Sequence, residues 1–198
     1  EDAAHGFAYI DLCHQRFDVI LMNPPFGKMA KGYEVQARAD YPNSYNDILG
    51  AFVERAVDQL HPGGLVGAIT SRTCFFLSSF ARWRATVVRG RAALTCMVDL
   101  GERVMDQATV EAAAYCLRAG ETPVTTAPVV RVLTAPDRDA ALLGAIDALR
   151  AGTPTPDAFL VTPRPAGAEG NGRPLAYWVP ENLSSALAQL TTFQAYIG

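Results

Sequence analysis

The chain has 198 residues, and its 17 lysines and arginines against 20 aspartates and glutamates give a net charge of −3 at pH 7. Hydrophobic residues make up 49% of the sequence and charged residues 19%, a balance that is typical of a globular protein and excludes a disordered one. No apolar run approaches the roughly 20 residues that cross a bilayer, so we expect no membrane-spanning segment.

The first predicted element is a strand over residues 17–22 (FDVILM), a continuous apolar run of the kind that is buried on both faces of a parallel sheet. Two prolines end it. The polar, irregular residues 27–41 predict a mobile loop. A helix is expected to begin near Asn46, and Pro62-Gly63-Gly64 should end it. Its predicted core face consists of residues at helical spacing: Ile48, Phe52, Ala56 and Leu60.

The rest of the chain alternates between strand and helix patterns, which indicates an α/β fold. Strands are predicted over 65–70, 93–100, 111–118 and 129–134, and helices over 78–88, 137–150 and 181–196. Residues 101–110 have no helical pattern, so the strands on either side should form an antiparallel pair at one end of the sheet. Residues 152–174 are rich in proline and glycine and predict a linker or a long loop.

Neither a metal site nor a targeting signal is visible in the sequence. The four cysteines, Cys13, Cys74, Cys96 and Cys116, lack the short spacings of metal ligands. We expect them to be reduced in a cytoplasmic protein. The chain starts without a methionine, in what reads as the middle of a domain, and no signal peptide is visible in its first residues. The sequence is therefore expected to be a fragment of a longer protein.

The most informative motif is Asn23-Pro24-Pro25-Phe26, which directly follows the first predicted strand. Open α/β sheets bind their ligands at the carboxyl ends of their strands, so this tetrapeptide is expected at a binding site. An exocyclic amine on a planar base is a poor nucleophile, because its lone pair is delocalised into the ring. The Asn23 side-chain oxygen and the Pro24 carbonyl can each accept one amine hydrogen and so aim the lone pair at a donor group.

The other residues of the motif fit the same chemistry. Pro24 and Pro25 fix their φ angles, which preorganises the two acceptors, and the residue before a proline is pushed towards extended geometry. Phe26 offers an aromatic face on which a flipped-out base can stack. Without this chemistry, the motif is a proline-rich turn after a strand that happens to carry an aromatic residue.

Residues 17–27 (FDVILMNPPFG) resemble the catalytic motif of amino-methyltransferases, especially of adenine-specific DNA methyltransferases of the gamma arrangement. Other stretches that agree with this family in order and spacing are residues 46–54, 60–70, 98–102 and 110–115. Within the family, residues 70–80 together with 110–115 resemble the large methyltransferases of BREX-type phage-defence systems. The resemblance covers about residues 7–118, with a weaker similarity at residues 177–180.

The resemblance implies a Rossmann-like methyltransferase sheet and S-adenosyl-L-methionine as cofactor. It implies double-stranded DNA with a flipped adenine as substrate, in restriction-modification or phage defence, with other phage-defence proteins as further partners. Asn23, Pro24, Pro25 and Phe26 match the catalytic motif. Expected cofactor contacts are Asp11, Leu12, Asn23 and Phe52. Asp11 and Phe52 also have purely structural interpretations: Asp11 as a polar residue at a strand end, and Phe52 as a core residue on the apolar face of its helix.

Two features depart from the family pattern. Val104 or Met105 stands where many members have a second aromatic residue against the target base. The chain is acidic, and its basic residues cluster at Arg82, Arg84 and nearby arginines. These and Arg72 either contact phosphate or lie on a solvated helix face.

The resemblance also implies missing parts. Residues 1–134 are expected to be the C-terminal half of the catalytic domain, because no glycine-rich cofactor loop precedes Asn23. Residues 135–198 are expected to be a helix, a linker and a helix that lead to a recognition domain. The isolated fragment should then be inactive.

Two other functions stay open. Methyltransferases that act on a ribosomal RNA guanine amine or a protein glutamine amide use the same Asn-Pro-Pro-aromatic clamp. The chain can also be an inactive remnant that serves as an interaction module.

Overall fold

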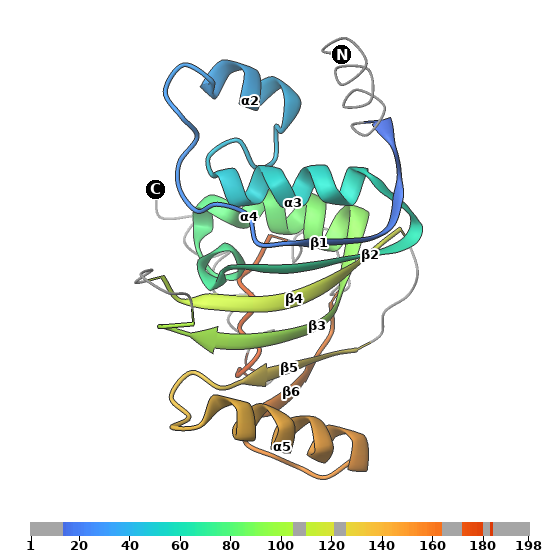
Figure 1. Cartoon of the computed structure of the whole chain (residues 1–198), viewed down its shortest axis with the longest axis vertical. Coiled ribbons are helices and arrows are strands. Elements are labelled where there is room, and N and C mark those ends of the chain that lie inside the picture. The colour runs from blue at the N-terminus through green and yellow to red at the C-terminus, as the bar shows by residue number, and fades with distance from the viewer. Residues whose placement is uncertain (1–13, 105–109, 121–125, 164–171, 180–182, 184–198) are drawn as a thin grey trace, which may run out of the picture.

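A six-stranded mixed sheet forms the centre of the molecule, in the order β1-β2-β4-β3-β5-β6 (Figure 1). This computed structural model describes residues 14–104, 110–120, 126–163, 172–179 and 183. The strands are β1 (Phe17–Met22), β2 (Leu60–Ser71), β3 (Ala92–Gly101), β4 (Ala112–Ala119), β5 (Ala127–Arg131) and β6 (Ala158–Val161). β1 is parallel to β2 and β3 to β5, while β4 is antiparallel to both β2 and β3. The carboxyl ends of β1, β2, β3 and β5 therefore share one side of the sheet, here called the carboxyl edge.

Helices pack on both faces of this sheet. The helical segments are α2 (Glu34–Asp40), α3 (Ile48–Asp58), η1 (Arg72–Phe75), η2 (Ser78–Phe80), α4 (Ala81–Trp83), the π-helix η3 (Arg84–Arg91) and α5 (Arg138–Ala151). α3 and η3 share the main core with one face of the sheet. α5 packs against Val98 and Val130, which alternate with the core residues Met97 and Val129 and so face the opposite side. None of the helices described is both long and apolar enough to span a membrane.

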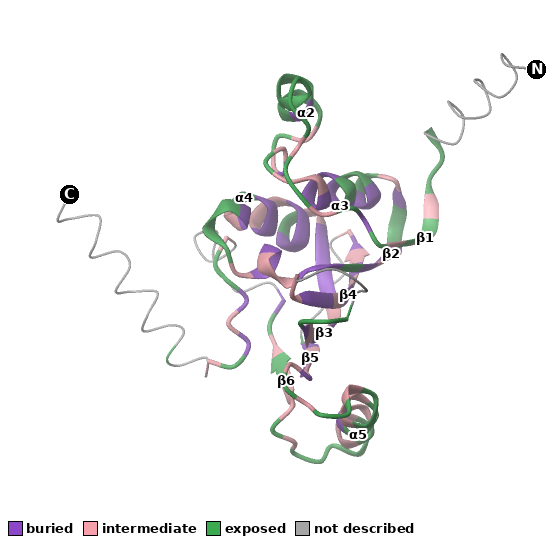
Figure 2. Cartoon of the chain, turned by 60° about the vertical axis from the view of Figure 1, so that its left-hand side comes forward, coloured by how far each residue is buried: buried purple, intermediate pink, exposed green. Residues whose placement is uncertain are grey.

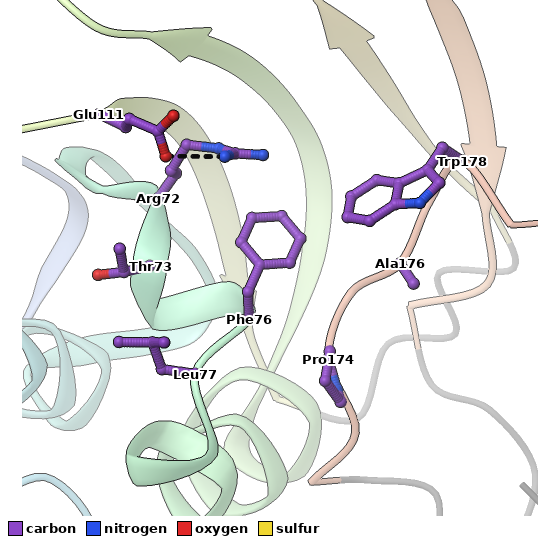
Figure 3. A pocket seen from close by; sticks show the side chains of 8 residues that line it. All are labelled: Arg72, Thr73, Phe76, Leu77, Glu111, Pro174, Ala176 and Trp178. Carbon is purple, nitrogen blue, oxygen red and sulfur yellow. Dashed lines mark hydrogen bonds and ion pairs between the residues drawn. The ribbon is translucent and has the colours of Figure 1, made fainter.

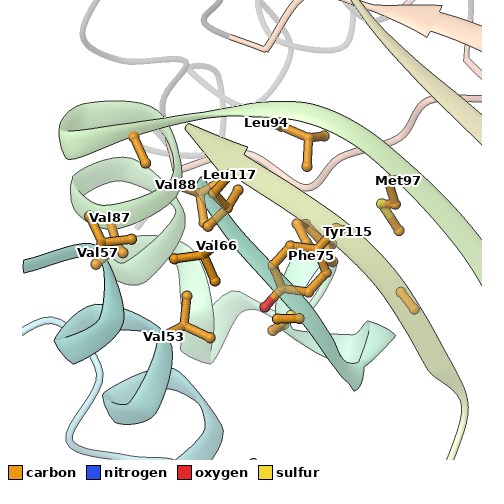
Figure 4. Close-up of a cluster of buried hydrophobic side chains, with 14 of the residues drawn as sticks. Val53, Val57, Val66, Phe75, Val87, Val88, Leu94, Met97, Tyr115 and Leu117 are labelled. Carbon is orange, nitrogen blue, oxygen red and sulfur yellow. The ribbon is translucent and has the colours of Figure 1, made fainter. Parts of the chain in front are cut away.

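The main core lies between the sheet and the α3–η3 layer (Figure 4). Phe75 stands at its centre, with its ring edge-on to Tyr115 at 4.9 Å and to Trp83 at 6.0 Å between centroids. Edge-to-face aromatic pairs of this kind contribute about 0.5–1.5 kcal/mol each beyond the area they bury. Phe75 belongs to η1, directly after β2, so this packing fixes the chain where it leaves the carboxyl edge.

The strand over residues 17–22 is confirmed, but the prediction that both of its faces are buried is wrong. Ile20 and Met22 pack against the main core, whereas Val19 and Leu21 are 56% and 79% exposed. β1 is the first strand of the sheet, and α5 lies at the other end of it (Figures 1 and 2). Nothing that the structure describes therefore covers this face of β1.

Three other expectations about elements need correction. Residues 27–41 are not wholly irregular, because α2 forms within them with Ala37 buried. The predicted linker over residues 152–174 contains β6, which pairs with β5. β3 and β4 are antiparallel as predicted, but β5 and β6 extend the sheet beyond β3, so the pair is not terminal. The predicted helix over residues 181–196 lies outside the described residues apart from Leu183.

Pro62-Gly63-Gly64 does not end α3, which stops at Asp58, but makes an irregularity inside β2. The pairing between β1 and β2 shifts between Phe17↔Leu60 and Val19↔Leu65, so β2 contains extra residues there. Gly63 has φ +83°, and a Cβ at Gly64 would lie 3.0 Å from the Asp18 carbonyl oxygen. Only glycines fit these two positions, since one needs a left-handed backbone and the other close contact with β1.

Residues 172–179, here called the strap, lie against η1 and η3, to which they are hydrogen-bonded. Arg84 is 1% exposed and donates five hydrogen bonds of 2.7–3.2 Å to carbonyl oxygens. Those carbonyls belong to Cys74, Leu77, Gly172 and Arg173. Arg84 thus lies neither on a solvated helix face nor in contact with phosphate, since its guanidinium joins the strap to the segment after β2.

Replacing Arg84 with methionine should lower the free energy of unfolding by about 3 kcal/mol, because several buried carbonyl groups lose a charged donor. Burial lowers the pKa of Arg84, so part of the lost bonding is offset by removal of a desolvated charge. Urea denaturation of Arg84→Met beside Arg82→Met tests this, since Arg82 is exposed and its side chain donates a single 3.0 Å hydrogen bond, to Asn43, within the described part of the chain. Arg82→Met should stay within about 0.5 kcal/mol, and equal losses in the two variants would contradict the role of Arg84.

Candidate active site

The tetrapeptide Asn23-Pro24-Pro25-Phe26 leaves the carboxyl edge directly after β1, where it was predicted. Asn23 and Pro25 are exposed, Pro24 is buried, and Phe26 is half-buried against the main core. No residue that the structure describes is hydrogen-bonded to the Asn23 side chain. Pro24 and Phe26 therefore anchor the motif against the protein, while the Asn23 side-chain amide, directly after the strand, stays accessible.

The chain after the motif is joined to the start of α3. The Gly27 carbonyl accepts a 2.9 Å hydrogen bond from the Ile48 amide. Asp47 caps the helix, because its side chain accepts a 3.0 Å bond from the Leu49 amide. Burial raises the pKa of Asp47, and that hydrogen bond opposes the shift. The motif is thus held at both ends, by β1 before it and by the helix start after it.

Phe52 is not the core residue that the helical spacing suggested. The buried face of α3 is formed by Leu49, Val53, Ala56 and Val57, and Phe52 is 49% exposed. It lies one helical turn after Ile48, whose amide binds the loop of the motif. The Phe52 ring is therefore accessible on a helix whose first residue, Ile48, is bonded to Gly27 directly after the motif. The other two expected cofactor contacts, Asp11 and Leu12, lie outside the described residues.

A buried carboxylate fixes the loop that precedes α3. Glu54 is 2% exposed and accepts hydrogen bonds from Asn43, at 2.7 Å, and from the Ser44 hydroxyl. It also forms an ion pair of 2.6 Å with Arg91 at the end of η3. A buried carboxylate needs such partners, because desolvation of a charge is costly without them. Arg91 is therefore engaged in internal contacts, as Arg84 is.

A second polar network, which the sequence did not reveal, lies farther along the carboxyl edge. Asp99 of β3 has no exposed surface, and its two carboxylate oxygens accept bonds of 2.7 and 2.8 Å from Arg72. Arg72 also pairs with Glu111 at 2.9 Å, and its guanidinium lies 4.7 Å from the centre of the Phe76 ring. Burial lowers the pKa of Arg72, but the bonds to Asp99 and Glu111 raise it by more. Arg72 is thus committed to two carboxylates and is not a free phosphate contact.

The strap completes this network. The Tyr177 hydroxyl donates a 2.6 Å hydrogen bond to Asp99, and the Leu175 amide binds the Phe75 carbonyl at 2.9 Å. Burial and the neighbouring Asp99 raise the pKa of Tyr177 above its ordinary value, so the phenol stays protonated and donating. The strap therefore joins the ends of β2 and β3 through one carboxylate.

A cavity of about 390 Å³ opens beside this network (Figure 3). Its lining residues are Arg72, Thr73, Phe76, Leu77, Glu111, Pro174, Ala176 and Trp178. Half of them come from the chain after β2 and three from the strap, so the cavity depends on the strap's position. Val104 or Met105 stands where many family members have a second aromatic residue. Val104 is 38% exposed, and Met105 lies outside the described residues.

Comparison with known proteins gives the same fold and one family. Residues 1–104 match the family described as Eco57I restriction-modification methylase. Over 137 residues the chain is 28% identical to the adenine-specific methyltransferase BrxX of Escherichia coli O9:H4 (strain HS). That match covers 66% of this chain but only 10% of BrxX, so the chain spans about a tenth of the relative's length.

Two solved structures share the fold. One, from Vibrio vulnificus YJ016, is described as a modification subunit of a type I restriction enzyme; it has a TM-score of 0.59 and 14% identity, over 75% of this chain and 34% of that one. The other, from Listeria monocytogenes, is described as a class I S-adenosylmethionine-dependent methyltransferase; it has a TM-score of 0.54 and 14% identity, over 68% and 42% of the two chains. The predicted α/β methyltransferase sheet is thereby confirmed.

Removing the Tyr177 hydroxyl should lower the free energy of unfolding by about 2 kcal/mol, because its hydrogen bond goes to a buried charge. Tyr177→Phe is compared in urea denaturation with Tyr115→Phe. The Tyr115 hydroxyl takes part in a longer, 3.5 Å bond with neutral Thr70 and is also buried. Tyr115→Phe should cost about 1 kcal/mol or less. A smaller loss for Tyr177→Phe than for Tyr115→Phe would contradict the place of Asp99 in holding the strap.

Proposed function

This chain belongs to the Eco57I restriction-modification methylase family, and from that premise we propose that the protein carrying it methylates the exocyclic amine of adenine in DNA. The observation that carries the proposal is the accessible amide of Asn23, held in an Asn-Pro-Pro-Phe motif at the carboxyl end of β1. The relative BrxX is named as an adenine-specific methyltransferase, which supports adenine as the base.

In this proposal the amine is oriented by two neutral acceptors. The Asn23 side-chain oxygen accepts one amine hydrogen and the Pro24 carbonyl accepts the other. Pro24 is buried and both prolines fix φ, so little reorganisation is needed when the base enters. The exposed part of the Phe26 ring stacks on the base, which has been flipped out of the duplex. No ionised base is needed, because the bond from nitrogen to the methyl group would form as the bond from the sulfonium sulfur to that methyl group breaks, and the methylated amine would then release its extra proton to water.

The donor side of the site is proposed to bind S-adenosyl-L-methionine, which supplies an electrophilic methyl group when bound. The fit rests on Phe52, the exposed aromatic ring on a helix whose other large apolar residues are mostly buried. Phe52 would stack on the adenine of the cofactor, Asn23 would border its methyl end, and Asp11 with Leu12 would complete the contacts. The half-exposed ring suits this task, since stacking needs an accessible face.

The substrate is proposed to be double-stranded DNA with a flipped adenine, in phage defence or restriction-modification. The chain has a net charge of −3. The guanidinium groups of Arg72, Arg84 and Arg91 are already bonded to groups within the protein, so these three side chains are poorly suited to bind phosphate. Lys28 and Lys31 follow the motif and are exposed, so they are the cations best placed to contact phosphate here. Further phosphate contacts are expected from other parts of the protein.

Replacing Asn23 with alanine should reduce methyl transfer at least about a hundredfold, as loss of one preorganised polar group does in other active sites. The measurement is transfer of tritiated methyl groups to unmodified duplex DNA by the natural full-length protein. Asn46→Ala is the control, because Asn46 is another exposed asparagine outside the motif. Label in ribosomal RNA or in protein, but not in DNA, would instead support the guanine-amine or glutamine-amide alternative. Folded, cofactor-bound protein that labels nothing would support an interaction module.

Replacing Phe52 with leucine should weaken S-adenosyl-L-methionine binding about tenfold, because an aromatic stacking face is lost. Isothermal titration calorimetry on the full-length protein measures the dissociation constant without requiring turnover. Leu143→Ala is the control, since Leu143 is 63% exposed on α5. An unchanged dissociation constant for Phe52→Leu would exclude Phe52 from the cofactor site.

A further inference from the structure

The cavity between η1 and the strap has no role in the proposed transfer reaction. We propose that it binds a second unstacked nucleobase of the DNA, separate from the adenine at Asn23. This inference rests on the proposed function, because it assumes that DNA lies along the carboxyl edge.

The cavity lies on the same edge of the sheet as the catalytic motif. β1 and β2 are parallel neighbours, and Met22 is paired with Ala68, so Asn23 is level with Ile69. Arg72, which begins the cavity wall, lies three residues farther along, or roughly 10 Å at about 3.3 Å per residue. Asn23 and Arg72 thus follow neighbouring parallel strands at the carboxyl edge, and DNA that lies along this edge would pass both.

The walls of the cavity suit a flat, apolar ligand (Figure 3). Phe76 and Trp178 contact each other at the cavity, with centroids 5.5 Å apart and planes tilted by 40°, so a base would stack on the exposed side of Trp178 and not between the two rings. Trp178 is 45% exposed and Leu77 is 51% exposed, so both still have surface to cover. Aromatic side chains that bind single-stranded nucleic acid use such exposed faces to stack on bases. The volume also falls within the range of pockets that bind small planar ligands.

The charges around the cavity favour a base over a phosphate. The Arg72 guanidinium is taken up by Asp99 and Glu111, so it does not offer a free cation. Glu111 is 41% exposed and only its Oε2 atom is bonded to Arg72. A carboxylate repels phosphate, but it accepts hydrogen bonds from the amino groups of adenine and cytosine. The cavity should therefore prefer bases that carry an exocyclic amine over thymine.

The cavity is also formed before any ligand enters. The strap is fixed by Arg84, which binds the Gly172 and Arg173 carbonyls, and by the bond from Tyr177 to Asp99. On the other wall, Phe76 is held beneath the Arg72 guanidinium at 4.7 Å. Neither wall needs to move far to receive a base, so binding loses little to ordering of side chains.

The test measures binding of fluorescently labelled single-stranded 12-mers of deoxyadenosine, deoxycytidine or thymidine, and of an abasic 12-mer, by anisotropy. The natural full-length protein is compared with Trp178→Leu, Phe76→Leu and Trp178→Tyr, and Val35→Ala is the control because Val35 is 84% exposed on α2. Trp178→Leu and Phe76→Leu should bind the base-containing 12-mers about tenfold more weakly and the abasic one unchanged. Trp178→Tyr keeps an aromatic face and should restore most of the binding.

Glu111→Gln is expected to reduce the preference for deoxyadenosine and deoxycytidine over thymidine, since an amide can also donate to thymine. The proposal is overturned if Trp178→Leu binds all four 12-mers as the unaltered protein does, or if it weakens the abasic one equally. Failure of the proposed function is distinguishable, because it appears as absent methyl transfer in the unaltered protein. Base-dependent binding through Trp178 would then still support the cavity as a base site.

Discussion

The carboxylate of Asp99 has no contact with solvent, and an ionised group in that position persists only where cations and donors replace its hydration. Arg72 supplies two bonds and Tyr177 a third. These partners come from two parts of the chain, the residue that follows β2 and the strap, while Asp99 itself lies near the end of β3. The need to satisfy one buried charge thus fixes how the carboxyl edge is assembled, and the cavity beside it follows from that assembly.

The bonded ionised side chains and the proposed catalytic residues occupy different positions along this edge. Three ionised groups near this edge, Arg72, Asp99 and Glu111, are bonded to one another, and Arg84 is bonded to backbone carbonyls. The proposed catalytic motif, by contrast, consists of neutral groups and would present acceptors at Asn23 and Pro24. This division suits methyl transfer to an amine, in which positioning of the reacting atoms matters more than proton abstraction.

Local patterns in the sequence predicted the elements that depend on local physics. The run FDVILM gives β1 with its predicted bounds, and the apolar residues 65–70 lie within β2. Asp47 caps a helix that begins close to the predicted start. The motif at Asn23 could be located because a strand end and two prolines are visible in the sequence. The family resemblance is confirmed by the match over residues 1–104.

What the sequence did not predict depends on distant partners. Arg84 is 88 residues from Gly172, so its burial could not be told from a solvated helix face. Phe52 fitted an apolar spacing, yet the core face of α3 is centred on Val53, and the ring is left exposed. β6 is short and lies in a proline- and glycine-rich stretch, and only its pairing with β5 makes it a strand. The cavity is likewise built from segments about 100 residues apart.

The most direct test of the central claim is to identify the methylated product. The natural gene would be expressed in a bacterium without adenine methylation, and the nucleosides of its DNA would be separated by liquid chromatography and analysed by mass spectrometry. Our account predicts N6-methyldeoxyadenosine that is absent when the Asn23→Ala gene is expressed instead. Methylated guanine in ribosomal RNA or methylated glutamine in protein, with unmodified adenine in DNA, would contradict it.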